Sequence, residues 1–472
     1  MAKAKSQKTA ASDEKAGATS ASGQSLQAAG KPHQLAGAAA HASAAKPGDL
    51  VLVDCNLGEQ KGILISSANS GTISIKLSSG YNIGIKKESI TGMEVLETGK
   101  PPSSAAHVRA SPLPKKDFLS ILGCGGTIVN KIDYRTGAVY PSTSPQELIQ
   151  SFPALEKFNL RAKTLFSVAS EDMSPSHWIE IANSVSEEIK SGAKGVVLTH
   201  GTDIMHYTSA ALSFMLQDLP CPVVLTGSQR SSDRSSSDSE ANLHGAVISA
   251  ASNLSGVFIC MHENISDETC LLHFGAKVRK MHTSRRDAFR SISSSPAARI
   301  FLGSEKVEQT SVLCKPRKEG SGHSLDTRMN QNVAMQYIYP GIKPKAISAL
   351  SDYDGVVLVG FGLGHVPVNI AGNPLSHSIL PEVKGLIDSG IPVVFASQTI
   401  HGRVNMMVYT NQRVLLKAGV IGQMCDMTPE TAYVKLMWVL GREKKMERVR
   451  EMMEKNIAGE ISARSELVDF DF

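Results

Sequence analysis

The sequence predicts an α/β protein in which a small N-terminal all-β barrel precedes two α/β units with largely parallel sheets. Before residue 100, short runs of alternating apolar residues are separated by Asn-Ser-Gly and Ser-Ser-Gly turn signals, a pattern typical of short antiparallel strands. After residue 116, short apolar runs alternate with helix-like stretches, which is the rhythm of a parallel sheet covered by helices on both faces. At 472 residues the chain is long enough for two or three domains.

Residues 1–46 consist mainly of Ala, Ser, Gly, Gln and Lys, with almost no large apolar side chains. Such a segment cannot bury enough apolar surface to offset the entropy lost on ordering, so we expect a disordered tail. The sequence leaves open whether its lysines contact RNA or an acidic partner, or only keep the tail soluble.

Residues 47–100 are expected to form a small SH3-like β-barrel. Its predicted strands come from the apolar runs at 51–53, 62–65, 72–77 and 81–85. Barrels of this kind often bind partners or RNA, and a purely structural role is equally compatible with the sequence. Residues 101–115 are rich in Pro and Ser and are expected to be a linker.

The first α/β unit is expected at residues 116–335, and the second at 336–472, where it ends in a helical tail. For the first unit, the apolar pattern predicts strands at 117–122, 163–168, 195–199, 222–226 and 256–260 and helices at 145–156, 175–191 and 205–216. Residues 300–336 are polar and irregular, as expected of a crossover between domains.

The second unit is predicted to contain strands at 346–350, 355–359 and 391–396. A helix should begin after Thr428, which suits an N-cap, with Pro429 at the first helical position, and should stop at Gly441. A charged helix at about 442–456 is expected to present a solvated face.

The composition is that of an ordinary soluble globular protein, with 42% hydrophobic and 20% charged residues. A net charge of +5 is too small to argue for nucleic-acid binding without a focused patch. The seven cysteines show no CxxC pair or repeated spacing, which favours a reducing compartment over a disulfide scaffold. No secretory signal or membrane-length apolar stretch is apparent, so we expect a cytoplasmic protein without membrane association.

Two clusters rich in glycine and threonine directly follow predicted strands. Gly125-Gly126-Thr127 follows the first strand, and Thr202-Asp203 follows the strand at 195–199. In an open α/β sheet, ligands bind beyond the carboxyl ends of the strands. Glycine suits a backbone that turns sharply beside a ligand, where there is no room for a Cβ atom. The two clusters therefore predict an enzyme with a hydroxyl nucleophile.

A threonine hydroxyl becomes a useful nucleophile only with a base or a lowered pKa. The sequence supplies Asp203 beside Thr202, Lys280 further along the chain, and Tyr134 one short loop after Thr127. A lysine can act as a base when its neighbours lower its pKa, and backbone N–H groups in glycine turns can stabilise an oxyanion. Taken singly, these features could be an ordinary turn, a helix N-cap and a surface charge. Their joint order makes the prediction specific.

That order resembles the type II bacterial asparaginase/glutaminase family over about residues 116–440. The matching strings are Gly125-Gly126-Thr127-Ile128, Tyr134-Arg135-Thr136-Gly137, Ser170-Glu171-Asp172-Met173, Thr199-His200-Gly201-Thr202-Asp203, Thr226-Gly227-Ser228-Gln229-Arg230 and Lys280. The resemblance implies two asparaginase-like α/β domains, with the catalytic residues on the N-terminal one. It also implies that this chain binds no metal or other cofactor.

The resemblance assigns a role to each matching side chain. It implies that Thr127 is the acylated nucleophile, with Tyr134 near its hydroxyl. Thr202, Asp203 and Lys280 would form the second catalytic group, in which Thr202 positions water or serves as the alternative nucleophile and Lys280 transfers protons.

The remaining matches would bind the substrate. Asp203 and Glu171 would hold the α-amino group, and Ser170 the α-carboxylate. For Glu171, an ordinary polar loop residue is the alternative. His200 is expected to be a structural hydrogen-bonding residue rather than a base, and the histidines at 273, 282 and 365 show no metal-ligand spacing.

Three further strings, together with the barrel, resemble the subfamily that supplies the D subunit of the archaeal glutamyl-tRNA(Gln) amidotransferase. They are Gly362-Leu363-Gly364-His365-Val366-Pro367, Gly402-Arg403-Val404-Asn405 and the stretch 427–436. This resemblance implies that the chain hydrolyses glutamine and supplies ammonia to the E subunit of the amidotransferase. The E subunit would use ATP and Mg to convert Glu-tRNA(Gln) to Gln-tRNA(Gln). The resemblance also implies a homodimeric core bound to two E subunits in a heterotetramer.

Two alternatives remain. The chain could be a free-standing cytosolic L-asparaginase, against which the barrel and the C-terminal strings argue. It could also be a non-catalytic tRNA-binding or assembly protein, against which the presence of Thr127, Thr202, Asp203 and Lys280 argues. The loop from Thr127 to Tyr134 is shorter than in the bacterial enzymes, so we expect a lid that is incomplete in the free chain and is completed by docking and tRNA.

Overall fold

The structure is a computed structural model. It describes residues 45–65, 71–77, 82–98, 117–132, 139–141, 144–150, 152–232, 237–318, 320 and 322–465. The expected tail, up to residue 44, and the expected linker lie outside the described residues.

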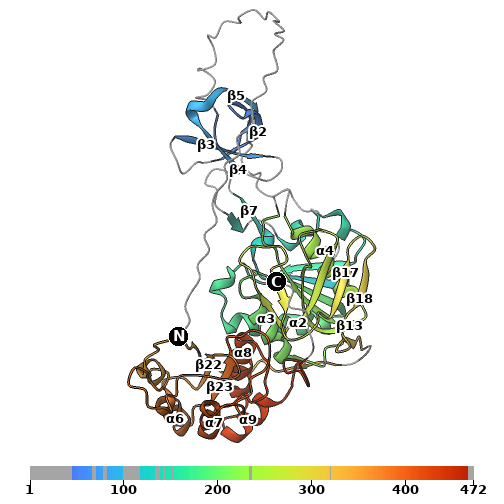
Figure 1. The fold of residues 1–472 in the computed structure, drawn as a ribbon. Helices are drawn as coiled ribbons and strands as arrows, with labels where there is room; N and C mark the ends of the chain where they lie inside the picture. The colour runs from blue at the N-terminus through green and yellow to red at the C-terminus, as the bar shows by residue number, and fades with distance from the viewer. Residues whose placement is uncertain are drawn as a thin grey trace, which may run out of the picture.

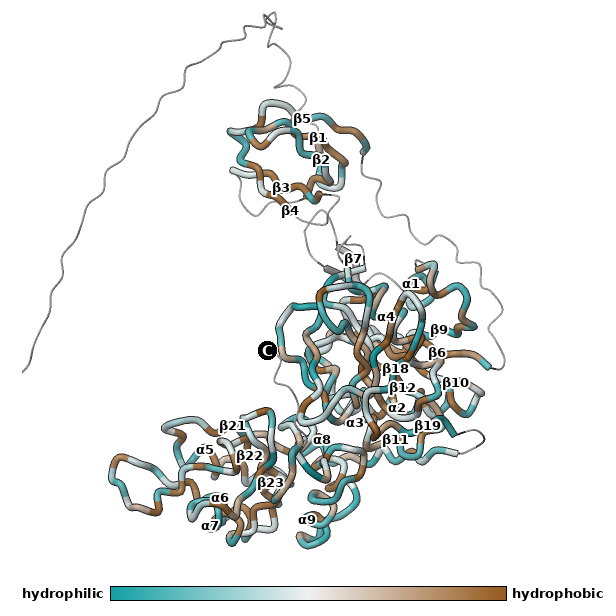
Figure 2. Tube along the Cα trace, turned by 45° about the vertical axis from the view of Figure 1, so that its right-hand side comes forward, coloured by the Kyte–Doolittle hydropathy of each residue, from teal (hydrophilic) through white to brown (hydrophobic). Residues whose placement is uncertain are grey.

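The N-terminal unit is a five-stranded antiparallel sheet in the order β4-β3-β2-β1-β5. Its strands are β1 (Leu50–Cys55), β2 (Gly58–Ile65), β3 (Thr72–Leu77), β4 (Asn82–Lys86) and β5 (Ile90–Glu97), with the short 3-10 helix η1 (Lys87–Ser89) between the last two. Alternate side chains such as Val51, Val53 and Ile75 turn inward to form a small core. The sheet curls into a ring in Figure 2, although the described residues contain no ladder between β4 and β5. The predicted small all-β unit is therefore present.

The second unit is built on a nine-stranded mixed sheet. From one edge its strands are β18 (Lys306–Gln309), β17 (Ala298–Phe301), β14 (Thr269–Phe274), β13 (Leu254–His262), β12 (Pro222–Thr226), β10 (Ala193–Thr199), β6 (Phe118–Gly123) and β9 (Leu160–Thr164), with β19 (Lys315–Pro316) paired to β13. The five strands from β13 to β9 are parallel, whereas β14, β17 and β18 continue the sheet in antiparallel fashion. The predicted parallel strands thus form the half of the sheet that contains β6 and β10.

Helices cover both faces of this sheet, as predicted for a parallel α/β arrangement (Figure 1). The helices of the unit are α1 (Pro145–Gln150), α2 (Pro175–Lys190), α3 (Met205–Met215) and α4 (Ser239–Ala251), with the 3-10 turns η2 (Thr127–Val129), η3 (Pro153–Leu155) and η4 (Ser170–Asp172). Val196 and Leu198 of β10 pack with α2 and α3, whereas the intervening Val197 packs with α4 on the other face. This period-two alternation separates two apolar cores.

The C-terminal unit has a three-stranded parallel sheet. Its elements are β21 (Val333–Tyr337), α5 (Pro344–Ser348), β22 (Gly355–Gly360), α6 (Leu380–Asp388), β23 (Val393–Ser397), α7 (Thr410–Ala418), α8 (Pro429–Leu440) and α9 (Met446–Glu454). Helices α5, α6 and α7 pack on one face. Helix α8 covers the other face and also packs on α3, so it joins the two α/β units (Figure 1).

The described residues also contain three two-stranded sheets. They are β7 (Asn130–Ile132) with β8 (Val139–Pro141), β11 (Leu216–Gln217) with β20 (Ser324–Leu325), and β15 (Val278–Lys280) with β16 (Phe289–Ser291).

Several sequence-based boundaries were wrong. The strand predicted at 346–350 is helix α5, because Pro344 starts a helix and the buried residues Ile347 and Leu350 are three positions apart. The missing strand is β21, which lies partly in the stretch interpreted as an irregular crossover. The strand predicted at 163–168 is β9, several residues earlier.

The helix predictions are correct in position but not always in length. The helix predicted at 145–156 stops at Gln150 in α1, and Pro153 begins a separate 3-10 turn. The predicted start of α8 is confirmed, because the Thr428 hydroxyl accepts a hydrogen bond from the Thr431 amide at 3.2 Å.

Candidate active site

Three loops leave the same edge of the nine-stranded sheet. Thr199 at the end of β10 lies opposite Gly123 of β6 on one side and Thr226 of β12 on the other. Within the sheet, the next strand, β9, lies beside β6 on one edge, whereas β10 and then β12 lie on the other side of β6. In open α/β sheets, the point where the strand order reverses in this way is the usual place for ligands.

Glycines allow these loops to touch through their backbones. Gly125 and Gly126 have φ values of 94° and 89°, in the left-handed region that favours glycine. A Cβ atom on Gly126 would lie 2.5 Å from the Gly201 nitrogen, and one on Gly227 would lie 2.4 Å from the His200 oxygen. The loop carrying Thr127 therefore packs directly on the loop carrying Thr202, which in turn packs on the loop after β12.

Three of the predicted catalytic residues are in direct contact. Lys280 Nζ donates a hydrogen bond to Thr202 Oγ1 at 2.8 Å and forms an ion pair with Asp203 Oδ1 at 2.7 Å. The side chains of Lys280 and Asp203 are 9% and 67% exposed, so the ammonium is largely covered while the carboxylate faces solvent. Residues 77 and 78 positions apart thus meet at one point, as predicted.

Thr127 belongs to the loop that packs on the Thr202 loop through Gly126 and Gly201. It is half-buried at the start of η2, directly after Gly126. Tyr134, predicted to lie near the Thr127 hydroxyl, is outside the described residues. In the loop between Thr127 and Tyr134, predicted to be an incomplete lid, the backbone is described up to Ile132, in η2 and β7.

The predicted substrate-binding residues Ser170 and Glu171 form the 3-10 turn η4 beside the same loops. Ser170 is buried against Gly201, since a Cβ atom there would lie 2.6 Å from the Ser170 Cβ. Its hydroxyl is 3.4 Å from Glu171 Oε2, and Glu171 is exposed. A hydroxyl and a second carboxylate therefore lie on a turn that packs against the Thr202 loop.

His200 supports the central loop from inside the protein, in agreement with the expected structural role. Its Nδ1 donates to the Gly201 oxygen at 2.6 Å, so the neutral ring can accept from the Thr208 hydroxyl at Nε2, 2.9 Å away. Complete burial lowers the pKa of His200 to about 4. The ring is therefore neutral near pH 7 with a defined tautomer.

Sequence reasoning missed two buried residues, Asp238 directly before α4 and Asn242 within it. Asp238 accepts backbone hydrogen bonds from Gln229 and Arg230 at 3.0–3.1 Å, and Asn242 donates to the Gly227 oxygen at 2.9 Å. Together they hold the Thr226–Arg230 loop against the Thr202 loop. No local pattern distinguishes them, because α4 also carries the polar residues Glu240, His244 and Ser249.

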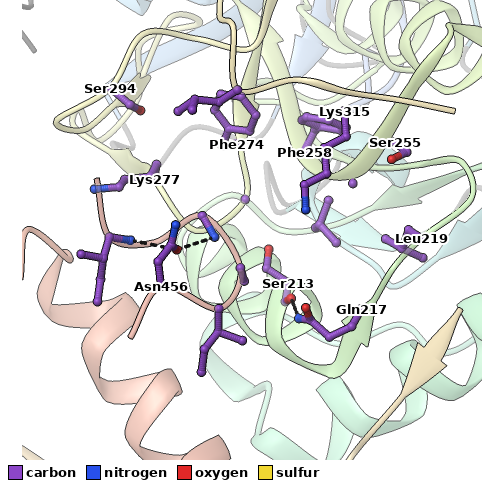
Figure 3. Close-up of a pocket in the computed structure, with 18 of the residues that line it drawn as sticks. Ser213, Gln217, Leu219, Ser255, Phe258, Phe274, Lys277, Ser294, Lys315 and Asn456 are labelled. Carbon is purple, nitrogen blue, oxygen red and sulfur yellow. Dashed lines mark hydrogen bonds between the residues drawn. The ribbon is translucent and has the colours of Figure 1, made fainter. Parts of the chain in front are cut away.

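A pocket of about 870 Å³ lies elsewhere, between this unit and C-terminal residues 456–464. The pocket is lined by Phe258, Phe274 and Lys315, and it contacts the amino end of β13 at Ser255 (Figure 3). It therefore lies toward the opposite end of the strands from the site, and none of the predicted site residues lines it.

Within the described ranges, no group of three or more His, Cys, Asp or Glu side chains is arranged to hold a metal ion. In the same part of the chain, no helix combines the length and apolar character required to cross a bilayer.

Comparisons with known families match most of the chain. The family models described as GatD N-terminal domain, as Asparaginase, N-terminal, and as Glutaminase/Asparaginase C-terminal domain match residues 45–96, 119–313 and 332–453, respectively.

Solved asparaginases share the fold of the two α/β units. The thermostable L-asparaginase from Thermococcus kodakarensis is 31% identical with a TM-score of 0.65, over 73% of this chain and 99% of that one. L-asparaginase I from Vibrio cholerae is 27% identical with a TM-score of 0.63, over 74% and 99% of the two chains.

Full-length relatives extend the similarity to the N-terminal unit. The D subunit of glutamyl-tRNA(Gln) amidotransferase from Pyrococcus furiosus is 47% identical over 83% of this chain and 87% of that protein. The corresponding D subunit from Methanothermobacter thermautotrophicus is 44% identical over 90% and 95%. The chain belongs to the family of D subunits of glutamyl-tRNA(Gln) amidotransferase, whose catalytic part is asparaginase-like.

Proposed function

We propose that the chain is the glutaminase subunit of a tRNA-dependent amidotransferase, in which Thr127 attacks the side-chain amide of glutamine. Attack would form an acyl-enzyme and release ammonia, and water would then release glutamate. The observation that supports this proposal most directly is the contact of Lys280 with Thr202 and Asp203 next to the loop of Thr127.

The assigned roles follow the chemistry of each side chain. Lys280 would transfer protons, and Thr202 would position water or act as the alternative nucleophile. Exposed carboxylates on Asp203 and Glu171 suit the cationic α-amino group of glutamine, and the Ser170 hydroxyl suits its α-carboxylate. Tyr134 would act near the Thr127 hydroxyl. Backbone N–H groups of the glycine turns would stabilise the oxyanion that forms on the amide oxygen.

Ammonia would pass to the E subunit of the amidotransferase, which would use ATP and Mg to amidate the glutamate of Glu-tRNA(Gln) in the cytoplasm. The names of the relatives support this division of labour. A shared complex would limit the loss of ammonia to bulk water.

A homodimeric core is part of the proposal. The loops after β22 and β23 expose the apolar side chains of Leu363, Leu375, Met407 and Val408. The backbone N–H of Asn405 donates a hydrogen bond to the Leu363 carbonyl oxygen at 2.8 Å, which brings the two loops together. Contiguous exposed apolar residues are typical of protein–protein contacts. Two E subunits would complete a heterotetramer.

A direct test is to trap the acyl-enzyme with a reactive glutamine analogue and to map the modified residue by mass spectrometry. The proposal predicts modification at Thr127, and Thr127→Ala should prevent it. Modification at Thr202 would reverse the order of the two threonines, and absence of any adduct in an active complex would refute covalent catalysis by threonine.

The fold also fits a free-standing L-asparaginase. Activity of the chain alone and with the E subunit and Glu-tRNA(Gln) separates the two functions. The amidotransferase proposal predicts glutaminase activity that rises on assembly, as expected if docking completes the lid. Strong asparaginase activity of the chain alone would favour the alternative.

A further inference from the structure

The strand that carries Lys280 is not part of the central sheet. Within the described residues, β15 pairs only with β16, in a two-stranded ladder that ends with Lys280 opposite Phe289. The position of the Lys280 ammonium therefore depends on whatever holds this short strand. Helix α3 contacts it, and the ion pairs that hold it come from the C-terminal unit.

Residues 426–431, which lead into and begin α8, contact three positions just before Lys280. Asp426 Oδ2 forms an ion pair with Lys277 Nζ at 2.7 Å, and both side chains are 3% exposed. Glu430 Oε1 pairs with Arg279 NH2 at 2.9 Å. The Thr431 hydroxyl donates to the Ala276 oxygen at 3.2 Å.

The alternation of side chains along an extended chain shows which side of the strand these contacts hold. Successive side chains point to opposite sides, so Lys277 and Arg279 share one side and Val278 and Lys280 the other. The C-terminal unit thus holds the side of the strand that faces away from Thr202. Figure 3 shows Lys277 at the edge of the pocket.

The environment of each carboxylate supports its ion pair. Asp426 Oδ1 accepts a hydrogen bond from the Ser462 amide at 3.0 Å, which leaves little freedom to follow a shift of Lys277. Glu430 lies in the first turn of α8, where the helix dipole favours a negative charge. Removal of either carboxylate would leave a largely buried cation without its partner.

We propose that Glu430 and Asp426 are positioning residues, which hold Arg279 and Lys277 and thereby set the distance from Lys280 Nζ to Thr202 and Asp203. The C-terminal unit would in this way control turnover at a site on the other unit. This inference rests on the proposed glutaminase function.

The test is Glu430→Gln in the assembled amidotransferase, with kcat and KM for glutamine measured separately. We expect kcat to fall about 10- to 100-fold, because a shift of about 1 Å in a catalytic group can have an effect of that size. KM should change little, since Glu430 is not among the proposed substrate-binding residues. Arg279→Lys, which keeps the charge, should retain more of kcat than Arg279→Met.

Asp326→Asn is the matched control. Asp326 pairs with Arg442 at 2.7 Å just beyond the other end of α8, and the two side chains are 26% and 9% exposed. The substitution removes the pairs of Asp326 with Arg442 and Arg328 without touching β15. We expect it to lower the melting temperature as Glu430→Gln does, and to leave kcat unchanged.

The outcomes distinguish the positioning role of Glu430 and Asp426 from the proposed glutaminase function. Wild-type kcat in folded Glu430→Gln and Arg279→Met variants would overturn the positioning role, and so would an equal loss of kcat in Asp326→Asn. Absence of glutamine hydrolysis by the wild-type complex would instead refute the proposed function.

Discussion

The two α/β units end their parallel strands in contrasting ways. In the nine-stranded sheet, the loops after β6, β10 and β12 pack backbone against backbone and carry hydroxyls and charges. In the three-stranded sheet, the loops after β22 and β23 expose apolar residues such as Leu375 and Met407. The same strand geometry therefore supports a candidate active site in one unit and a proposed protein contact in the other, and the loops make the difference.

Substitution of the proposed nucleophile should have the largest effect. We expect Thr127→Ala to lower glutamine-dependent amidation by roughly a thousandfold or more, because the covalent step would be lost. Amidation from added ammonium should persist, as measured by formation of Gln-tRNA(Gln). Survival of both activities in the variant would favour the scaffold alternative.

The glycines of the two strand ends offer a direct contrast. Gly126→Ala would place a Cβ atom 2.5 Å from the Gly201 nitrogen, so the two loops must separate and activity should be lost. Gly362, after β22, also has a positive φ, of 44°, but its Cβ atom would meet nothing within 4 Å. Gly362→Ala should therefore cost only the backbone strain, about 1–2 kcal/mol in urea unfolding, and spare activity. Equal effects of the two substitutions would contradict the close packing of the loops.

Acid should weaken the catalytic unit through His200. Its pKa is lowered to about 4 in the folded protein, so between about pH 6.5 and pH 4 the unfolded chain binds the proton more readily. Stability from this group is present above pH 6.5 and is lost as the pH falls, by roughly 3 kcal/mol in total. Urea unfolding as a function of pH should show a shallower decline for His200→Asn. An unchanged slope would mean that other groups dominate; His206 and His273, whose pKa values burial lowers to about 3, would then be the next to test.

The smallest effect on folding is expected at the apolar surface of the C-terminal unit. Leu375 is 91% exposed, so Leu375→Lys should change stability by less than about 0.5 kcal/mol while weakening the proposed homodimer. Sedimentation velocity measures the dimer. Ile265→Lys, at a 75% exposed position after β13, is the control and should leave the dimer intact. A dimer that tolerates Leu375→Lys would place the contact elsewhere.

Local patterns predicted the parts of the site that depend on local geometry. The turn glycines at 125 and 126 and the Thr428 cap have requirements that a few neighbouring residues reveal. The apolar runs of β10, β12 and β22 were also clear, because strands buried on both faces are continuously apolar. The meeting of Lys280 with Thr202 was predicted only from the family resemblance.

Features that depend on distant partners were missed. Asp238 and Asn242 stabilise the loop after β12 through backbone hydrogen bonds that no local pattern reveals. The short segment at 344–350 resembled a strand because its few apolar residues fit either period, and its packing against α6 makes it a helix. The ion pairs from Lys277 and Arg279 span about 150 residues, beyond any sequence window.

Buried Lys435 on α8 limits how far the C-terminus can be shortened without loss of stability. Its ammonium is fully enclosed, with the Glu460 carboxylate and the carbonyl oxygens of Met453 and Lys455 as its partners. The similarity to the asparaginase C-terminal domain ends at residue 453. A truncation at that point would remove Glu460 and leave the buried Lys435 ammonium without a counter-charge. An expression boundary chosen from similarity alone would therefore yield an unstable product, and the autonomous folding unit extends at least through Glu460.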